Sequence, residues 1–422
     1  MSALEQQTPE GYKQAEVGLL PDDWDCVTLG DLGDIVRGGS PRPAGDPKYF
    51  NGNYIPWLTV ASLTNIPASK QEVTSTLTKL TELGSKQSRI LDAGTLIISN
   101  SGATLGVAKI LGLKCCANDG VAAIINQKKG NKSFITHYIN TQTKRLHDDV
   151  ATGNGQPNLN TDLIKLIPIP FPSESEQTAI ANALSDVDAL LTELEKLIAK
   201  KQAIKTATMQ QLLTGKTRLP QFATYIEGTL EGNSQGQLKG TKPSELGEIP
   251  EDWDVVYLGD KTIFVGSGKT STKEKGDFPL YGSTGQIGTC KNGDYKGDAL
   301  LIARVGANAG SLNFVTGNYG VSDNTIIIKL QKDEDISFYK YLLIRKNLNS
   351  LVFGSGQPLI TGSQLKSLKV IYPKQEEQTA IATILTDMDN EIQTLEHRLK
   401  KTRQIKQGMM QELLTGKTRL PF

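Results

Sequence analysis

Two glycine-containing segments have residue types that could hold a phosphate group. GSGKT at Gly266 to Thr270 matches the end of a phosphate-binding loop, in which backbone N–H groups and a lysine surround phosphates. The full pattern needs a glycine at position 263, where the chain has Ile263, and no helical pattern follows Thr270. The TGKT of the segment LLTGKTRLP lacks the same first glycine and has Gln210 in its place. We therefore interpret both as chance matches.

Other catalytic or metal-binding arrangements are equally incomplete. FVGSG at Phe264 to Gly268 imitates the glycine turn of an S-adenosylmethionine methyltransferase, but the tetrapeptide of Asp or Asn, two prolines and an aromatic residue that accompanies it is absent. The cysteines and histidines lack the spacing of zinc ligands. They are Cys26, Cys115, Cys116, Cys290, His137, His147 and His397. We predict no metal site and name no catalytic residue.

The composition is that of an ordinary globular protein. The chain has 422 residues, 38% of them hydrophobic and 22% charged, with a net charge of +1. It has no run of about 18 apolar residues and no apolar segment at the N-terminus, so we expect neither a membrane span nor a signal peptide, and a cytoplasmic location. A nucleic-acid partner is not indicated by so weak a net charge.

The most informative feature is an internal duplication. The nonapeptide LLTGKTRLP begins at Leu212 and again at Leu413, an offset of 201 residues (413 − 212). That offset aligns Pro172 to Pro220 with Pro373 to Pro421 without a gap, and about half of the paired residues are identical. Such a period is far too long for a solenoid, whose repeats have roughly 20 to 50 residues. The chain is therefore a duplicated pair of domains.

The starts of the two copies also correspond, whereas their middles do not. GLLPDDWDCVTLGD at Gly18 to Asp31 answers GEIPEDWDVVYLGD at Gly247 to Asp260. The middles, Asp34 to Thr152 and Lys261 to Phe353, hardly match. The shared ends therefore perform one common task, and the middles perform different ones.

Each duplicated end has the apolar spacing of a long coiled-coil helix, alternating four and three residues. The predicted seam residues are Ile180, Leu184, Val187, Leu191, Leu194, Ile198, Ile381, Leu385, Met388, Ile392, Leu395 and Leu399. Gly215 and Gly416 are suited to end the helices. A helix of about 40 residues is roughly 60 Å long. We expect the two helices to pair with each other in antiparallel orientation; the alternative is that each packs separately on its own domain.

The middles have the pattern of mixed α/β domains. Short apolar runs bounded by glycine predict strands at Gly94 to Ser99, Val121 to Asn126, Ala299 to Ala303 and Asn324 to Leu330. Amphipathic stretches near Phe134 to Val150 and Ser337 to Leu351 predict one helix in each domain. Glycine-rich polar loops recur at equivalent places, and their small and polar residues suit close contact with phosphates and base edges.

These motifs together resemble the specificity (S) subunit of Type I restriction-modification enzymes. The resemblance covers nearly the whole chain: a PxxW segment opens each variable domain, a GQP segment closes it, and an EQTAIA helix ending in LLTGKTRLP follows. It implies target-recognition domain 1 at 1–172, a spacer helix at 173–220, a linker with target-recognition domain 2 at 221–372, and a second spacer helix at 373–422. The two spacer helices would form an antiparallel coiled coil with pseudo-twofold symmetry.

The resemblance also implies DNA-contacting residues in the turns of both domains. Those expected in the first domain are Ser40, Arg42, Asn100, Ser101, Thr104, Gln156 and Asn158, with Trp57 as a supporting or stacking aromatic residue. Those expected in the second domain are Lys269, Thr270, Ser283, Thr284, Arg304, Asn308 and Gln357, with Tyr281 in the same supporting role.

By the same resemblance, the chain is a non-catalytic DNA reader in which each domain reads one half of a split, asymmetric target. Its partners would be double-stranded DNA, two modification (M) subunits and restriction (R) subunits, and not a membrane. It would bind no cofactor; S-adenosylmethionine, ATP and Mg²⁺ would belong to the partner subunits. Two other hypotheses are a DNA methyltransferase or nuclease that acts alone, and a coiled-coil scaffold that binds only protein.

Overall fold

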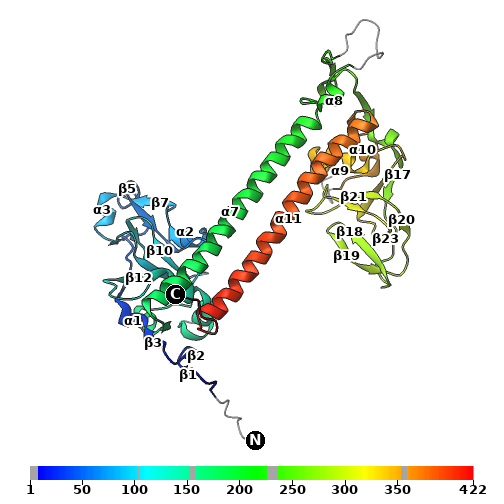
Figure 1. The fold of residues 1–422 in the computed structure, drawn as a ribbon. Helices are drawn as coiled ribbons and strands as arrows, with labels where there is room; N and C mark the ends of the chain where they lie inside the picture. Colours follow the sequence, from blue (N-terminus) through cyan, green and yellow to red (C-terminus); the bar gives the residue numbers. More distant parts are fainter. Residues whose placement is uncertain (1–7, 103, 153–156, 226–235, 353–358, 422) are drawn as a thin grey trace. The chain divides into compact units, whose positions relative to one another are not determined.

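The computed structural model describes residues 8–102, 104–152, 157–225, 236–352 and 359–421 (Figure 1). The chain divides into two compact units: Met1–Leu197 together with Glu396–Phe422, and Ile198–Leu395. We call them unit 1 and unit 2. Each unit groups one predicted recognition domain with parts of both predicted spacer helices. No helix in the described part of the chain is both long and apolar enough to span a membrane.

The two duplicated segments form the longest helices. Helix α7 spans Glu174–Leu212 and α11 spans Gln375–Leu413, and Figure 1 draws each without interruption. The Ser173 hydroxyl accepts a hydrogen bond from the backbone N–H of Glu176 at 3.3 Å, which satisfies one of the free donors at the start of α7. Gly215 and Gly416 have φ angles of +69° and +70°, the left-handed conformation expected just after a helix.

In unit 1 the predicted recognition domain is built on two sheets. The first has the order β4-β12-β9-β10-β6, with all neighbours antiparallel except β10 and β6. The second has the order β7-β5-β11-β8. Their strands are β4 Asp34–Arg37, β5 Phe50–Leu58, β6 Glu72–Val73, β7 Thr78–Leu80, β8 Arg89–Leu91, β9 Leu96–Ser99, β10 Ala108–Leu111, β11 Cys115–Ala117 and β12 Val121–Ile125.

Smaller elements complete unit 1. Two antiparallel ribbons pair β1 with β2 and β3 with β13. These strands and the short helices are β1 Tyr12–Ala15, β2 Gly18–Pro21, β3 Asp25–Thr28, β13 Pro168–Phe171, α1 Leu29–Leu32, α2 Val60–Thr64, α3 Glu82–Ser85, α4 Lys132–Thr141, α5 Thr143–Arg145 and α6 Thr161–Lys165. A π-helical turn covers Leu146–Val150.

Unit 2 repeats this plan with four-stranded sheets of order β17-β24-β21-β22 and β19-β18-β23-β20. Its sheet strands are β17 Thr262–Ser267, β18 Phe278–Gly282, β19 Gly285–Cys290, β20 Tyr295–Lys296, β21 Ala299–Ala303, β22 Leu312–Val315, β23 Asn318–Val321 and β24 Thr325–Leu330. Ribbons pair β14 Thr241–Ser244 with β15 Gly247–Pro250, and β16 Asp254–Tyr257 with β25 Lys369–Tyr372. Its shorter helices are α8 Pro220–Ala223, α9 Ile336–Arg345 and α10 Gly362–Lys366.

The four strands predicted from apolar runs are confirmed as β9, β12, β21 and β24, and each lies at the centre of a sheet. The predicted helices correspond to α4 and α9, which are shorter than expected. After α4 the chain continues as α5 and the π-helical turn, and after α9 as a 3-10 turn at Leu348–Leu351. The mixed α/β class holds for both domains.

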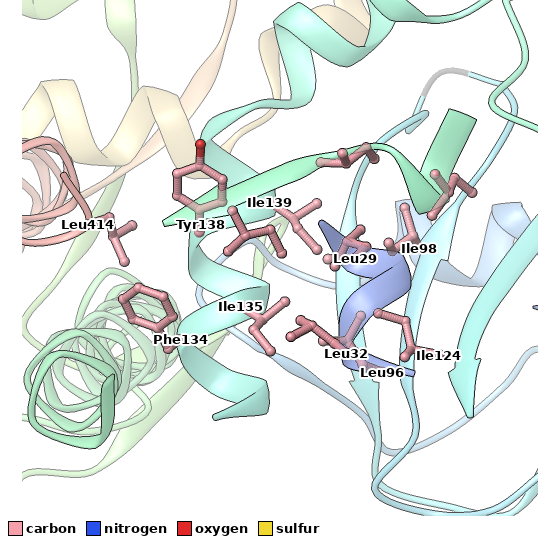
Figure 2. Close-up of a cluster of buried hydrophobic side chains, with 14 of the residues drawn as sticks. Leu29, Leu32, Leu96, Ile98, Ile124, Phe134, Ile135, Tyr138, Ile139 and Leu414 are labelled. Carbon is pink, nitrogen blue, oxygen red and sulfur yellow. The ribbon is translucent and has the colours of Figure 1, made fainter. Parts of the chain in front are cut away.

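The core of unit 1 joins the sheet to both long helices. Leu29 and Leu32 of α1 pack with Leu96, Ile98 and Ile124 of the first sheet, and Figure 2 shows α4 beside them. On another side of α4, Phe134 and Tyr138 lie near Leu414, which directly follows α11 (Figure 2). The end of the second copy is therefore part of the core around the first recognition domain.

Antiparallel pairing of the long helices is confirmed within each unit. In unit 1, Lys406 and Arg403 of α11 form ion pairs with Asp188 and Glu195 of α7. In unit 2, Lys205 and Lys201 of α7 pair with Asp389 and Glu391 of α11. In both units the partner's number falls as the residue number rises, which is the signature of antiparallel helices.

The predicted seam residues are all at least partly buried. Val187, Met388 and Leu395 are intermediate, and the other nine are less than 10% exposed. Ile180 and Leu184 belong to the core of unit 1, and Ile381 and Leu385 to the core of unit 2. Packing on the neighbouring domain therefore accounts for the first turns of each helix.

Candidate nucleic-acid interface

One glycine turn recurs with the same hydrogen bonds among its described residues in both predicted recognition domains. In unit 1 the N–H of Gly106 donates to the carbonyl of Ser99 at 2.8 Å, and in unit 2 the N–H of Gly310 donates to the carbonyl of Ala303 at 2.9 Å. Inside the turns, Gly102 and Gly306 have φ angles of +76° and +75°. Most side chains are strained in this conformation, so glycine is favoured at both positions.

The residue at the entrance of each turn is held by two equivalent backbone hydrogen bonds. Asn100 donates to the carbonyl of Gly120 and accepts from the N–H of Leu159, both at 2.9 Å. Arg304 donates to the carbonyl of Asn324 at 2.9 Å and accepts from the N–H of Ile360 at 3.0 Å. One frame thus carries asparagine in the first domain and arginine in the second.

Three predicted residues of unit 1 converge on Asp119, which the sequence did not single out. The Ser40 hydroxyl donates to the Asp119 carboxylate at 2.6 Å, and the Arg42 guanidinium lies 3.9 Å from it. The Asn100 side-chain amide donates to the Asp119 backbone carbonyl at 3.2 Å. The Ser40 hydrogen bond, aided by the charges of Arg37 and Arg42, lowers the pKa of the Asp119 carboxyl. Loops distant in sequence therefore meet at one polar cluster.

Arginine residues surround this cluster. Arg42 is largely exposed, so it can move from Asp119 to a phosphate at little cost. The Arg37 side chain donates to the Asp119 carbonyl at 2.5 Å, and the Arg89 side chain donates to the Arg37 carbonyl at 2.8 Å. Arg37 and Arg89 come from strands 52 residues apart, and no sequence motif links them. Guanidinium groups fixed this way are suited to phosphate oxygens and to guanine edges.

The remaining predicted residues of unit 1 occupy different environments. Ser101 and Asn158 face each other in an isolated antiparallel bridge, beside the glycine turn. The Thr104 hydroxyl is buried without a partner among the described residues. Trp57 is 5% exposed and packs edge to face against Phe50, with ring centroids 6.1 Å apart, so it supports the loops from within.

In unit 2 the predicted residues divide between support and exposure. The Thr270 hydroxyl is buried and accepts the N–H of Val321 at 3.0 Å, so it stabilises its loop. Tyr281 packs edge to face on Tyr319 at 6.1 Å. The Arg304 guanidinium lies 3.4 Å from the Ser267 hydroxyl. Lys269, Thr284 and Asn308 are exposed, and Ser283 is half-buried. Gln156 and Gln357 lie outside the described residues.

Behind the loops, the duplicated segments meet in two equivalent junctions. In unit 1 the Trp24 indole donates to the Glu176 carboxylate at 3.0 Å, and Arg419 binds both Glu176 and Asp23. In unit 2 the Trp253 indole donates to Glu377 at 2.8 Å. There Arg218 binds Glu377 at 2.7 Å and Asp252 at 2.8 Å. Each arginine belongs to the nonapeptide of one copy, and each glutamate to the EQTAIA segment of the other.

The adjacent glutamine of each EQTAIA segment positions the helix of a variable domain. The Gln177 side chain accepts the N–H of Asn131, which caps α4, at 2.8 Å. The Gln378 side chain accepts the N–H of Asp335, which caps α9, at 3.3 Å. This explains why these segments are alike although the middles differ: the shared residues attach either domain to the helices in the same way.

Among the residues that the structure describes, no group of three or more His, Cys, Asp or Glu side chains is placed to hold a metal ion. The four cysteines are free thiols, and three of them are buried. Burial raises the pKa of the Cys115 thiol to about 12, so it stays protonated and unreactive at neutral pH.

Solved structures and curated relatives resemble this chain over nearly its full length. The S subunit structure of a Type I restriction-modification system from M. genitalium has a TM-score of 0.60 at 16% identity and covers 92% of this chain and 96% of its own. A structure from a study of assembly and conformational transition of the type I R-M system has a TM-score of 0.55 at 15% identity, covering 94% and 99%. Both likenesses concern the fold.

The sequence relatives carry the same kind of name. The Type I restriction enzyme MjaVIII specificity subunit of Methanocaldococcus jannaschii is 26% identical, over 97% of this chain and 96% of its own length. The Type I restriction enzyme EcoKI specificity subunit of Escherichia coli K12 is 24% identical, over 86% and 82%. The family model described as Type I restriction modification DNA specificity domain matches residues 21–206 and 250–407. Two matches that together span most of the chain show that this protein belongs to the Type I restriction-modification DNA specificity family.

Proposed function

We propose that this chain is the non-catalytic DNA-recognition subunit of a Type I restriction-modification complex. Each recognition domain reads one half of a split, asymmetric DNA target, and the paired helices fix the separation of the halves. The likeness to named specificity subunits over both repeats supports this role.

The observation that carries the proposal is that both domains have the same glycine turn and backbone hydrogen bonds but different side chains on them. The glycine turns place Asn100 and Arg304, Ser101 and Val305, and Thr104 and Asn308 at corresponding positions. Base edges are read by side-chain hydrogen bonds, so equal backbones with unlike side chains serve two different sequences in the same way. An asymmetric target follows directly.

The partners proposed are double-stranded DNA, two M subunits and the R subunits. S-adenosylmethionine, ATP and Mg²⁺ would be bound by those partner subunits, which would carry out methylation, translocation and cleavage. The junctions around Trp24 and Trp253 support a frame that presents both halves alike, because each uses the same tryptophan, glutamate and arginine contacts.

The test is to co-express the chain with its neighbouring M subunit in a methylation-deficient host and to map methyladenine by single-molecule sequencing. We expect one split motif whose halves differ and which disappears when this chain is omitted. If the complex forms but no motif emerges, the proposal is refuted and a protein-binding scaffold is favoured. Methylation or cleavage by the purified chain alone would identify it instead as an enzyme.

A further inference from the structure

One ion pair between the long helices occurs twice, at positions related by the internal repeat. In unit 1 the Lys406 ammonium is 2.6 Å from the Asp188 carboxylate, and in unit 2 Lys205 pairs with Asp389. The offset of 201 relates Asp188 to Asp389 and Lys205 to Lys406. The pairs Glu195–Arg403 and Glu391–Lys201 do not recur as pairs of opposite charges, because the copy of Arg403 is the neutral Gln202 and the copy of Glu391 is Leu190.

The repeated pair of unit 1 is buried, and that of unit 2 is partly buried. The side chains of Asp188 and Lys406 are 7% and 14% exposed, and those of Asp389 and Lys205 are 33% and 21% exposed. By contrast, the Arg403 and Glu195 side chains are 59% and 34% exposed. A buried charge that loses its partner is costly, whereas an exposed one is not. Together with the Arg419–Glu176 and Arg218–Glu377 junctions, the repeated pairs can therefore favour a single helix arrangement.

At each pair, residues of the recognition domain lie beside the aspartate. In unit 2 the Tyr341 hydroxyl of α9 donates to Asp389 at 2.7 Å, and Lys340 lies 3.8 Å from it. In unit 1, His137 of α4 and Lys109 of β10 line one cavity with Asp188 and Lys406. Counted from the shared Ser-Phe at the start of each helix, His137 corresponds to Tyr341. Each aspartate is thus the place where α7, α11 and a recognition domain meet.

The apolar seam by itself does not select one register. A heptad pattern repeats every seven residues, so sliding one helix by seven residues again places apolar side chains opposite apolar ones. The charged pairs do not permit this shift. After it, Asp188 would face Leu399 or Leu413 (406 − 7 or 406 + 7), and Asp389 would face Ile198 or Leu212 (205 − 7 or 205 + 7). Polar seam residues are known to specify register in this way.

We propose that the Asp188–Lys406 and Asp389–Lys205 pairs are positioning residues for spacing specificity: they hold each recognition domain at one place along the helix pair. This rests on the proposed function. A slip of seven residues, at about 1.5 Å per residue, moves a recognition domain by roughly 10.5 Å along the helix pair, which corresponds to about three base pairs of DNA spacer at roughly 3.4 Å each. A domain fixed at its carboxylate rejects a site whose spacer differs by that amount, and a domain released from it accepts the site.

The decisive variant replaces one pair by apolar residues, Asp188→Leu with Lys406→Met. Apolar replacement of a buried ion pair is often neutral or stabilising. The variant should therefore keep the fold but lose the ion pair that favours one register of the two helices. A second variant, Asp188→Lys with Lys406→Asp, reverses the pair and keeps its complementarity. The matched control is Glu195→Gln with Arg403→Gln, which removes the exposed pair that lies nearby on the same two helices.

The readout is the spacer length in the methyladenine map of each complex, with the melting temperature of the purified chain measured alongside. We expect wild type and the Glu195/Arg403 control to methylate one spacer length. The apolar variant should also methylate sites about three base pairs longer or shorter, roughly tenfold above wild type, without loss of melting temperature. The reversed pair should return to a single length.

The outcomes separate this inference from the proposed function. A single spacer length in the apolar variant overturns the inference while leaving the proposed function intact. The inference is also overturned if the reversed pair methylates as many spacer lengths as the apolar variant. If wild type itself yields no split motif, the proposed function fails first. Should the apolar variant of unit 1 not fold, the same comparison is made with Asp389→Leu and Lys205→Met, where the pair is more exposed.

Discussion

Arg419 donates through Nη2 to the Glu176 carboxylate at 2.8 Å, although 243 residues separate them in the chain. The same guanidinium binds Asp23 at 2.9 Å and lies over the Trp24 ring, 5.8 Å from its centroid. Glu176 is 1% exposed, and its buried carboxylate is paired with this arginine and with the Trp24 indole. The last residues of the chain therefore complete the junction on which the first recognition domain is mounted.

Removing this arginine should destabilise unit 1 strongly. We expect Arg419→Met to lower the free energy of unfolding by about 3 kcal/mol, because it leaves a buried carboxylate without its cation. Urea denaturation monitored by tryptophan fluorescence measures the change. Arg403→Met, which removes an exposed pair with Glu195, should cost less than about 1 kcal/mol. Equal losses for the two variants would show that the junction has no special role.

Substitution by alanine should be more harmful at a glycine of the glycine turns than at a glycine of a helix. Gly306→Ala introduces a methyl group that meets no atom within 4 Å, but at a φ of +75° the new residue is strained by about 1 to 2 kcal/mol. We expect weaker discrimination of one half-site in DNA-binding assays with the assembled complex. Gly408→Ala, in α11 and also without neighbours within 4 Å, should instead stabilise the protein by up to about 1 kcal/mol. Unchanged discrimination by Gly306→Ala would exclude the turn from recognition.

Base and phosphate contacts in the second domain should be separable. Arg304→Ala should cost about 1 to 3 kcal/mol and relax one position of one half-site, as expected for a base contact. Lys269→Ala changes an exposed loop residue, so it should weaken binding equally for all sequences. It should also reduce the slope of log K against log salt concentration by about one. Competition binding at several salt concentrations distinguishes the two patterns. A uniform loss for Arg304→Ala would reassign it to the phosphates.

Acid should destabilise unit 1 through His137. Burial, together with the charge of Lys406, lowers the pKa of His137 from 6.5 to about 3. Between these values the unfolded chain binds a proton that the folded chain does not bind, so stability is lost as the pH falls below about 6.5. The slope approaches about 1.4 kcal/mol per pH unit.

The variant His137→Gln removes this contribution, so its free energy of unfolding should fall less steeply than that of wild type between pH 6 and pH 4. Denaturation curves at several pH values measure the difference. His147→Gln is the matched control, because the His147 ring is about half exposed. Parallel pH profiles for wild type and His137→Gln would contradict the burial argument.

Local patterns in the sequence determined the two long helices, their antiparallel pairing and the central strands. Heptad spacing and apolar runs between glycines depend on neighbours a few residues away, and such patterns are legible without a structure. The duplication then predicted that the two helices pair with each other, because each copy has an apolar seam that the seam of the other copy can cover. The glycine turns were also found from the sequence, because glycine-rich polar loops recur at equivalent places in both copies.

Only the tertiary structure decided which polar groups meet. One polar cluster brings together Asp119, Arg37 and Arg89 with Ser40 and Asn100. It forms because strands distant in sequence end at the same place, and the spacing of these residues in the sequence does not predict it. Trp57 and Thr270 are buried inside the fold, which the sequence alone did not show, because burial depends on which strands pair. Asp188 and Lys406 are charged residues at repeated positions of the sequence. Their importance comes from their burial between two helices and a domain, and this burial is produced by contacts between residues more than 200 positions apart.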